Sequence, residues 1–266
     1  PTPGTRHRRD EMERPHGTTA AGWAGDLALR GMLGTLRRVM RPATVRIDGL
    51  RVPVDRAWPP AILRALDFGS YELPERMAVR ALVGRSDRVL ELGAAIGVVG
   101  SAILRARPAM ARHYEANPAL IPHARATFAA NGEAAPDLRC AAVVGGGHDG
   151  GTATLHVGQA FWGSGLAARR SSVGTVEVPA IRFTEVLDDF RPTVIVMDVE
   201  GAECALLGEA PPGALAGVRA VSVETHPAET GNAAVSAMLA RLLAEGLHLD
   251  LGRSRGRNLV LRRDLP

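Results

Sequence analysis

From Arg88 onward, apolar runs alternate with stretches of helix-like spacing, a rhythm typical of a mostly parallel sheet with helices between its strands. The apolar runs have strand length and are expected to form strands over 87–92, 111–115, 137–143, 193–198 and 219–224. Helices are expected over 96–107, 117–131, 200–209 and 230–245. Two short alternating stretches, 152–156 and 175–178, interrupt the rhythm, and 248–251 with 258–261 predict a closing antiparallel pair. The pattern therefore predicts an α/β fold.

The segment before residue 85 has a different pattern and predicts a small α+β extension. Asp48-Gly49 between the apolar-containing stretches 44–47 and 50–52 is a strong hairpin signal, and helices are expected near 59–66 and 72–83. Residues 22–40 have helix-like spacing, whereas 1–20 combine prolines and charges without periodicity. We expect a disordered leader over 1–20, the N-terminal extension over 21–84 and the main domain over 85–266.

The composition argues against nucleic-acid and membrane partners. All 32 basic residues are arginines, but 28 acidic residues reduce the net charge to +4, and aromatic residues make up only 4% of the chain. No apolar run reaches the roughly 18 residues of a membrane span, and no signal-peptide pattern is present. Cys140 and Cys204 form neither a zinc-ligand pattern nor a disulfide framework. We therefore expect no metal site and a cytoplasmic protein.

Chemistry is expected at the glycine turn that follows the first strand of the main domain, residues 93–97. A strand, glycine turn and helix bring backbone N–H groups close to a nucleotide-like ligand, although similar glycine spacings also occur in ordinary helix packing. The carboxyl ends of parallel strands meet at one edge of a sheet, where ligands bind. The polar residues at these ends are Glu91, Glu115, Asp198 and Glu224, with His226 just beyond.

Glu115 lies 22 positions after Gly93, where an acidic residue accepts hydrogen bonds from the two hydroxyls of a ribose. The ligand is therefore expected to be a nucleoside. A dinucleotide fits poorly, because Ala95 replaces the second glycine of the dinucleotide fingerprint and Glu91 repels phosphate. Glu91 suits an ammonium group instead. S-adenosylmethionine has a ribose, an ammonium and a sulfonium but no phosphate, and it is the expected cofactor.

Five blocks of the sequence resemble, in order and spacing, the FkbM-type S-adenosylmethionine-dependent methyltransferases. The blocks are 91–97, 114–118, 178–181, 197–203 and 224–227, and residues 69–72 are similar to a further feature of the family. The resemblance covers roughly 44–262, and Asp198-Val199-Glu200-Gly201-Ala202-Glu203 is its most specific part. It implies the Rossmann-like sheet of class I methyltransferases and O-methylation of a sugar or a specialised metabolite. The implied partner is a small-molecule or glycosyl acceptor, and a homodimer is left open.

The sequence departs from the family at four positions. Glu91 replaces the usual Asp, Ala95 replaces Asn, Ala116 replaces a frequent Pro, and Val196 replaces a frequent Lys. We expect the changes at 95 and 196 to remove polar groups from the pocket, which leaves a non-catalytic S-adenosylmethionine-binding module as an alternative. A second alternative is an NAD(P)-dependent oxidoreductase, but the chain has neither the lysine nor the Cys/His set that such enzymes commonly use.

The expected site residues follow from the strand ends and from the resemblance. Cofactor contacts are expected from Glu91, Gly93, Ala94, Ala95, Gly97, Glu115, Ala116, Asn117 and Asp198. Substrate contacts are expected from Glu72, Glu224 and Trp162, the last of these in the long loop 157–174.

The candidate catalytic residues are His226, Glu200 and Asp198. We expect His226, with an ordinary pKa near 6.5, or Glu200 to take the acceptor's proton while Asp198 orders the pocket. The alternatives are that Glu200 caps a helix, that His226 satisfies loop backbone, and that Asp198 only holds the cofactor.

Overall fold

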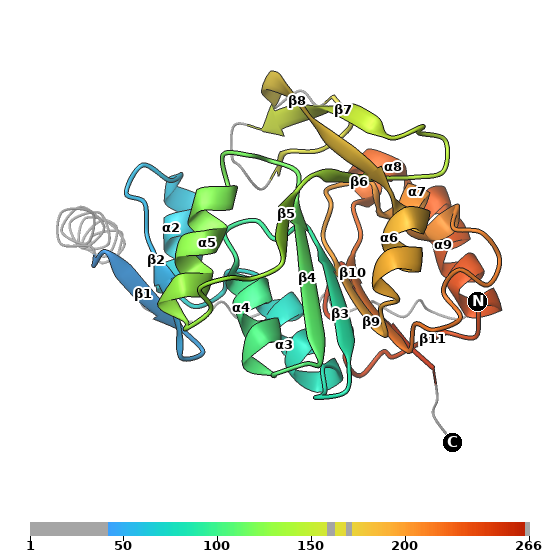
Figure 1. Cartoon of the computed structure of the whole chain (residues 1–266), viewed down its shortest axis with the longest axis horizontal. Coiled ribbons are helices and arrows are strands. Elements are labelled where there is room, and N and C mark those ends of the chain that lie inside the picture. The colour runs from blue at the N-terminus through green and yellow to red at the C-terminus, as the bar shows by residue number, and fades with distance from the viewer. Residues whose placement is uncertain (1–41, 159–162, 169–171, 264–266) are drawn as a thin grey trace, which may run out of the picture. The chain divides into compact units, whose positions relative to one another are not determined.

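The computed structural model describes residues 42–158, 163–168 and 172–263 (Figure 1). The chain from Ala43 to its end forms one compact unit. The predicted leader, the predicted helix over 22–40 and Trp162 lie outside the described residues. The described helices all lack the combination of length and apolar character that a membrane-spanning helix needs.

A seven-stranded sheet forms the centre of this unit, in the order β11-β12-β10-β9-β3-β4-β5. The strands from β10 to β5 are parallel to one another, and β12 and β11 continue the sheet antiparallel at one edge. The predicted mostly parallel sheet with a closing antiparallel pair is therefore confirmed. Its strands are β3 (Arg88–Leu92), β4 (Met110–Glu115), β5 (Leu138–Cys140), β9 (Val194–Met197), β10 (Ala220–Glu224), β11 (His248–Leu249) and β12 (Asn258–Arg262).

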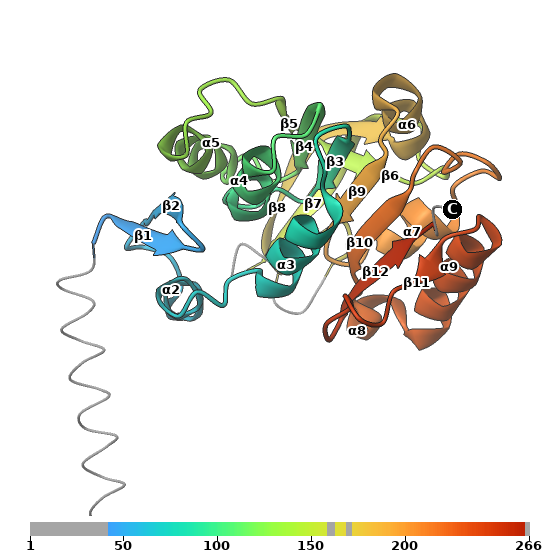
Figure 2. The same ribbon diagram turned by 90° about the horizontal axis from the view of Figure 1, so that it is seen from below.

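Both faces of the sheet are covered by helices, which explains why its inner strands are apolar at almost every position. Val89 and Val194 pack toward α3 (Leu73–Leu82) and α4 (Val98–Arg105), whereas the next residues along each strand, Leu90 and Ile195, face the opposite side. Figure 2 shows the two groups of helices on either side of the strands. The helices on the second side are α6 (Phe183–Phe190), α7 (Glu203–Gly208) and α9 (Asn232–Ala244).

The helix predictions differ from the structure in two places. The predicted helix over 230–245 consists of α8 (Pro227–Thr230) and α9, separated at Gly231, which has a φ of 82°. Helix α6 was not predicted. The other three predicted helices of the main domain, over 96–107, 117–131 and 200–209, correspond to α4, α5 (Ile121–Ala130) and α7.

A second sheet lies beyond one end of the large sheet (Figure 1) and has the order β6-β8-β7. The stretch predicted as one strand over 137–143 divides at Ala141, so that β5 stays in the large sheet and β6 (Ala142–Val144) enters the second one. There β6 pairs parallel with β8 (Ser172–Arg182), and β7 (Gly151–Gly158) pairs antiparallel with β8.

The N-terminal hairpin has the predicted turn. β1 (Thr44–Ile47) and β2 (Leu50–Pro53) are joined by Asp48 and Gly49, which both have positive φ, 52° and 80°, as a two-residue type I′ turn requires. The hairpin and α2 (Pro60–Asp67) share one apolar cluster with Ile96 and Val98 at the start of α4. The extension therefore supports the glycine turn directly.

Candidate active site

The glycine turn between β3 and α4 is shaped by close backbone contacts. Gly93 has a φ of 91°, and a Cβ atom on it would lie 1.8 Å from the carbonyl oxygen of Asp198. Gly97 has a φ of 81°, and its Cβ would lie 2.9 Å from the carbonyl oxygen of Ala124. Ala95 also has a positive φ of 45°, in the left-handed region that costs a residue with a Cβ about 1–2 kcal/mol. The two glycines are thus required by neighbouring backbone, whatever the ligand.

Glu115, at the end of β4, fixes this turn from the neighbouring strand. Its Oε2 accepts a hydrogen bond from the N–H of Ala95 and its Oε1 accepts one from the N–H of Asn117, both at 2.7 Å. An ionised carboxylate has about four acceptor positions, so two remain for ribose hydroxyls. Burial raises the pKa of Glu115 from 4.5 to about 7, although both N–H groups favour the ionised form.

Glu91, which the sequence predicts to bind an ammonium group, lies outside the cavity beside this turn. Its side chain is only 1% exposed, and its Oε2 lies 2.5 Å from Nδ1 of His113, which is fully buried. A Cβ on Gly100 of α4 would lie 2.7 Å from the same oxygen. The carboxylate therefore points between the sheet and α4, apart from the residues that line the cavity.

Three other predicted cofactor residues shape the turns without lining the cavity. Ala94 packs in an apolar cluster with Phe128, and Gly97 contacts α5. The side-chain oxygen of Asn117 accepts a hydrogen bond from the N–H of Ala119. The predicted cofactor residues that do line the cavity are Gly93, Ala95, Glu115, Ala116 and Asp198.

Acidic side chains from three elements meet where β9 and β10 end. Asp198 follows β9, Glu224 ends β10 and Glu72 precedes α3. The Oδ1 atom of Asp198 is buried and has no hydrogen-bond donor. Burial, followed by the charges of Glu224, Glu200 and Glu72, raises the pKa of Asp198 well above its ordinary value. Burial and the charge of Glu75 likewise raise the pKa of Glu72. Both carboxyl groups therefore hold a proton more readily than an isolated carboxyl group does.

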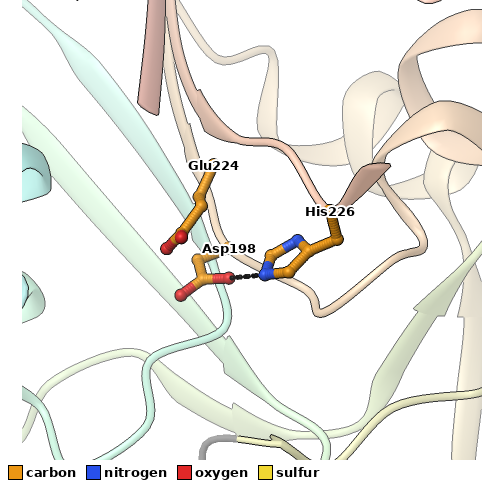
Figure 3. Close-up of side chains that lie close together, drawn as sticks. All are labelled: Asp198, Glu224 and His226. Carbon is orange, nitrogen blue, oxygen red and sulfur yellow. Dashed lines mark ion pairs between the residues drawn. The ribbon is translucent and has the colours of Figure 1, made fainter. Parts of the chain in front are cut away.

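His226 is 4% exposed and lies against this acidic group (Figure 3). Its Nδ1 is 2.6 Å from Oε1 of Glu203, and its Nε2 is 3.6 Å from Oδ1 of Asp198 and 3.5 Å from Oε2 of Glu200. Burial alone lowers the pKa of His226, but the hydrogen bond and charge of Glu203, with the charges of Glu200 and Glu224, outweigh burial and raise it. The surroundings of His226 therefore favour a pKa above the ordinary value near 6.5.

Two cavities meet at this acidic group. Glu72, Asp198 and Glu200 line both of them. The first cavity lies beside the glycine turn and is also lined by Glu115 and by apolar side chains, among them Leu92, Leu120, Val143 and Leu155. Residues 164–166 of the predicted binding loop also line it, whereas Trp162 lies outside the described residues. The second cavity is lined by Tyr71, Glu75, Glu224, Arg255, Arg257 and Asn258, among others.

Sequence reasoning did not find several residues of the second cavity. Glu75, on α3, accepts a hydrogen bond from Nδ2 of Asn258 at 3.1 Å, and Arg257 pairs with Glu224 at 2.5 Å. Tyr71 is buried, and burial together with the charge of Glu72 raises the pKa of its hydroxyl. These residues come from segments far apart in the chain, so no local pattern indicates them.

The structure also changes the interpretation of Val196. Its side chain is 3% exposed and packs with Ala78 and Val79 of α3, outside the residues that line the two cavities. The replacement of the family's lysine at this position therefore removes no polar group from the cavity lining, contrary to the expectation. Ala95, by contrast, does line the first cavity.

Comparison with known proteins gives a family match and several distant structural similarities. Residues 91–250, more than half of the chain, match the family described as the methyltransferase FkbM domain. No curated protein matches the sequence. Among solved structures, a ribosomal protein L11 methylase from Lactobacillus delbrueckii subsp. bulgaricus has 11% identity and a TM-score of 0.44, covering 73% of this chain and 79% of that chain.

Two further solved structures have comparable similarity. A TehB-like SAM-dependent methyltransferase from Corynebacterium glutamicum has 12% identity and a TM-score of 0.40, over 77% of this chain and 95% of that one. The tRNA (uracil-54, C5)-methyltransferase of Pyrococcus abyssi has 11% identity and a TM-score of 0.41, over 83% of this chain and 44% of that one. Similarities this low do not extend to substrate or mechanism.

Proposed function

The chain belongs to the FkbM methyltransferase family, and from this premise we propose that it transfers a methyl group to a hydroxyl oxygen of a sugar or a specialised metabolite. The methyl donor of the family is S-adenosylmethionine. One observation carries the proposal: a cavity beside the glycine turn and a second cavity meet at Asp198 and Glu200, and the buried His226 lies against both of these carboxylates. The first cavity suits the cofactor, and the second suits the acceptor.

The first cavity contains the groups that an S-adenosyl ligand requires. Glu115 keeps acceptor positions for two ribose hydroxyls, and Leu120, Val143 and Leu155 offer apolar surface to an adenine ring. Asp198 offers negative charge to an ammonium group, a role that the buried Glu91 does not fill. When bound, S-adenosylmethionine supplies a methyl group on a sulfonium, whose sulfur keeps the bonding electron pair as the methyl leaves.

His226 and Glu200 are placed to take the proton that an acceptor hydroxyl loses. Glu203 holds the imidazole ring by accepting a hydrogen bond from its Nδ1, which leaves the lone pair of the neutral ring on Nε2. That nitrogen lies 3.5 Å from Oε2 of Glu200, so the two groups share one region of the junction. The raised pKa of His226 makes Nε2 a stronger base but reduces its neutral fraction at pH 7. Either group can therefore serve as general base.

The experiment measures S-adenosylhomocysteine binding and transfer of a labelled methyl group to hydroxyl compounds and to fractionated metabolite extracts. His226→Ala and Glu200→Gln are expected to keep S-adenosylhomocysteine binding, and at least one is expected to lower turnover by roughly 10²-fold or more. His248→Ala, which changes an exposed histidine of β11, is the matched control and should turn over like the parent.

Three outcomes would contradict the proposal. If labelled methyl groups were found only on nitrogen or sulfur atoms of the products, the proposed transfer to oxygen would be wrong. Binding of S-adenosylhomocysteine without any methyl transfer would favour a binding module. If both His226→Ala and Glu200→Gln turned over like the parent, neither residue would be the general base.

A further inference from the structure

We propose that the junction of the two cavities binds a divalent cation through Asp198, Glu224 and His226, and that this cation binds the oxygens of the acceptor. The inference rests on the proposed O-methylation and deepens it. It narrows the acceptor to a compound with two adjacent oxygen atoms, such as a vicinal diol or an α-hydroxy carbonyl compound.

The three side chains have the geometry of a cation site. One potential ligand atom from each of Asp198, Glu224 and His226 lies within 4.8 Å of the other two. An ion of the size of Mg²⁺ or Mn²⁺, at about 2.0–2.2 Å from each ligand, needs ligand atoms roughly 3–4.5 Å apart, which small side-chain movements reach from here. Figure 3 shows the three side chains gathered around one point from the ends of neighbouring chain segments.

The surroundings of His226 are those of a metal ligand that is held in place. Glu203, which is fully buried, accepts a hydrogen bond from Nδ1, and a carboxylate in this position orients the other ring nitrogen toward a metal. That nitrogen, Nε2, faces the buried Oδ1 of Asp198 across 3.6 Å, which is too long for a hydrogen bond. In the neutral ring both atoms present lone pairs to each other. A cation between them satisfies both.

The charge of the junction also favours a cation. Among the described residues that line the second cavity, five are carboxylates and two are arginines, Arg255 and Arg257. The ion pair of Arg257 uses only Oε1 of Glu224, and the Arg257 side chain is 58% exposed at the rim. The other oxygen of Glu224 is therefore left for a metal. A divalent ion offsets part of the remaining repulsion among the five carboxylates, which are Glu72, Glu75, Asp198, Glu200 and Glu224.

The three ligands indicate which ion binds and how that ion would act on the acceptor. Two carboxylates and one imidazole suit Mg²⁺ or Mn²⁺, and three protein ligands leave about three positions of an octahedron open. Two open positions can take adjacent oxygens of the acceptor. A hydroxyl bound to the cation is more acidic, and because the cation occupies Nε2 of His226, Glu200 is the candidate base that takes its proton. Its oxygen then uses a lone pair to form the new O–CH₃ bond, while the S–CH₃ electron pair stays on sulfur.

The test uses the full chain, treated with EDTA and then freed of it, and Mn²⁺ as the probe. Titration followed by electron paramagnetic resonance is expected to show one saturable site. Glu224→Gln should weaken Mn²⁺ binding at least about tenfold, on the scale seen when metal-site residues are changed. It should keep S-adenosylhomocysteine binding, because Glu224 is not among the residues that line the first cavity. Asp149→Asn, at a fully exposed carboxylate, is the matched control and should bind Mn²⁺ like the parent.

The outcomes separate this inference from the proposed function. Absence of saturable Mn²⁺ binding, or equal binding by the parent and Glu224→Gln, would overturn the cation site and leave O-methylation standing. Full methylation of hydroxyl acceptors in excess EDTA would overturn its catalytic use. One-site Mn²⁺ binding that is lost in Glu224→Gln, together with no methylation of any hydroxyl acceptor, would support the cation site and overturn the proposed function.

Discussion

The assignment of Glu115 to the ribose hydroxyls can be tested in two ways, by the substitution Glu115→Gln and by the pH dependence of ligand affinity. In the parent protein, the Glu115 carboxylate must be ionised to accept two backbone N–H groups and two ribose hydroxyls at once. With its pKa raised to about 7 by burial, the ionised fraction falls from about nine-tenths at pH 8 to about one-tenth at pH 6. Affinity for S-adenosylhomocysteine is therefore expected to fall about tenfold between these pH values, or about 1.4 kcal/mol.

Glutamine removes this pH dependence and weakens binding at every pH. Its amide nitrogen must face either the N–H of Ala95 or the N–H of Asn117, and it accepts no bond from a ribose hydroxyl. Loss of hydrogen bonds to a charged group, with a buried N–H left unpaired, is expected to cost about 1.5–3 kcal/mol of binding free energy at pH 8.

Isothermal titration calorimetry at pH 6, 7 and 8 measures both effects. Adenosine is the second ligand, because it keeps the ribose and lacks the amino-acid end whose own charges could titrate. A parent affinity that does not change with pH, or a Gln variant that keeps the tenfold change, would refute the assignment of Glu115 to the ribose.

The same group predicts a change in folding stability without ligand. Because its pKa is higher in the folded than in the unfolded chain, the contribution of Glu115 to stability is complete below about pH 4.5. It is lost as the pH rises through about 7, and the loss approaches about 3 kcal/mol. The free energy of unfolding in urea should therefore fall more for the parent than for Glu115→Gln between pH 5 and pH 7.5. An equal fall in the two proteins would contradict this.

Three further substitutions test the turn and the histidine. Ala95→Gly relieves the left-handed conformation of Ala95 and should raise the free energy of unfolding in urea by up to about 1 kcal/mol, so a lower value would contradict the argument. Gly93→Ala places a Cβ against the carbonyl oxygen of Asp198 and should lower the same quantity by at least about 2 kcal/mol, whereas unchanged unfolding would show that the two backbones separate without cost. Glu203→Gln removes the charge that raises the pKa of His226 and should lower the pKa that an NMR titration of this imidazole measures in the metal-free protein, while an unchanged pKa would contradict the argument.

The sheet could be predicted from the sequence because its inner strands are buried on both faces and therefore appear as short apolar runs. The hairpin could be predicted because Asp48-Gly49 is suited to a turn with two positive φ values. Helix α6 also has a readable signal, since Phe183, Val186, Leu187 and Phe190 have helical spacing and are buried. It was missed because it follows β8 directly, without a turn signal between them.

The rule that polar residues end the strands led to the candidate site residues, and the structure places Glu91 outside the lining of both cavities. Successive side chains of a strand point to opposite faces, so Glu91 and Leu92 cannot both face the cavity. Leu92 lines the cavity, and Glu91 consequently points between the sheet and α4, where His113 is its partner. Which of two successive side chains faces the cavity depends on the residue at which the strand ends. Strand ends predicted from a sequence are not accurate to one residue, so the sequence could not decide between Glu91 and Leu92.

The proposed cation ligands were not visible as a metal motif for a different reason. Asp198 and His226 are 28 positions apart and follow β9 and β10, which are hydrogen-bonded neighbours in the sheet. The two residues become neighbours only because β9 and β10 pair in parallel. A search of the sequence for closely spaced Cys and His residues therefore does not detect them. The same pairing brings Glu203 within hydrogen-bond distance of His226.

The departures from the family at positions 95 and 196 give little support to a loss of catalysis. The change to Val196 lies against α3, so it takes nothing from the lining of either cavity. The change to Ala95 removes an amide from the first cavity, but the N–H of Ala95 still donates to Glu115. A binding module that had lost catalysis would have no need of a buried histidine that Glu203 orients toward Asp198 at the junction. Such a group is costly to bury, and its position beside the carboxylates favours a chain that performs chemistry there.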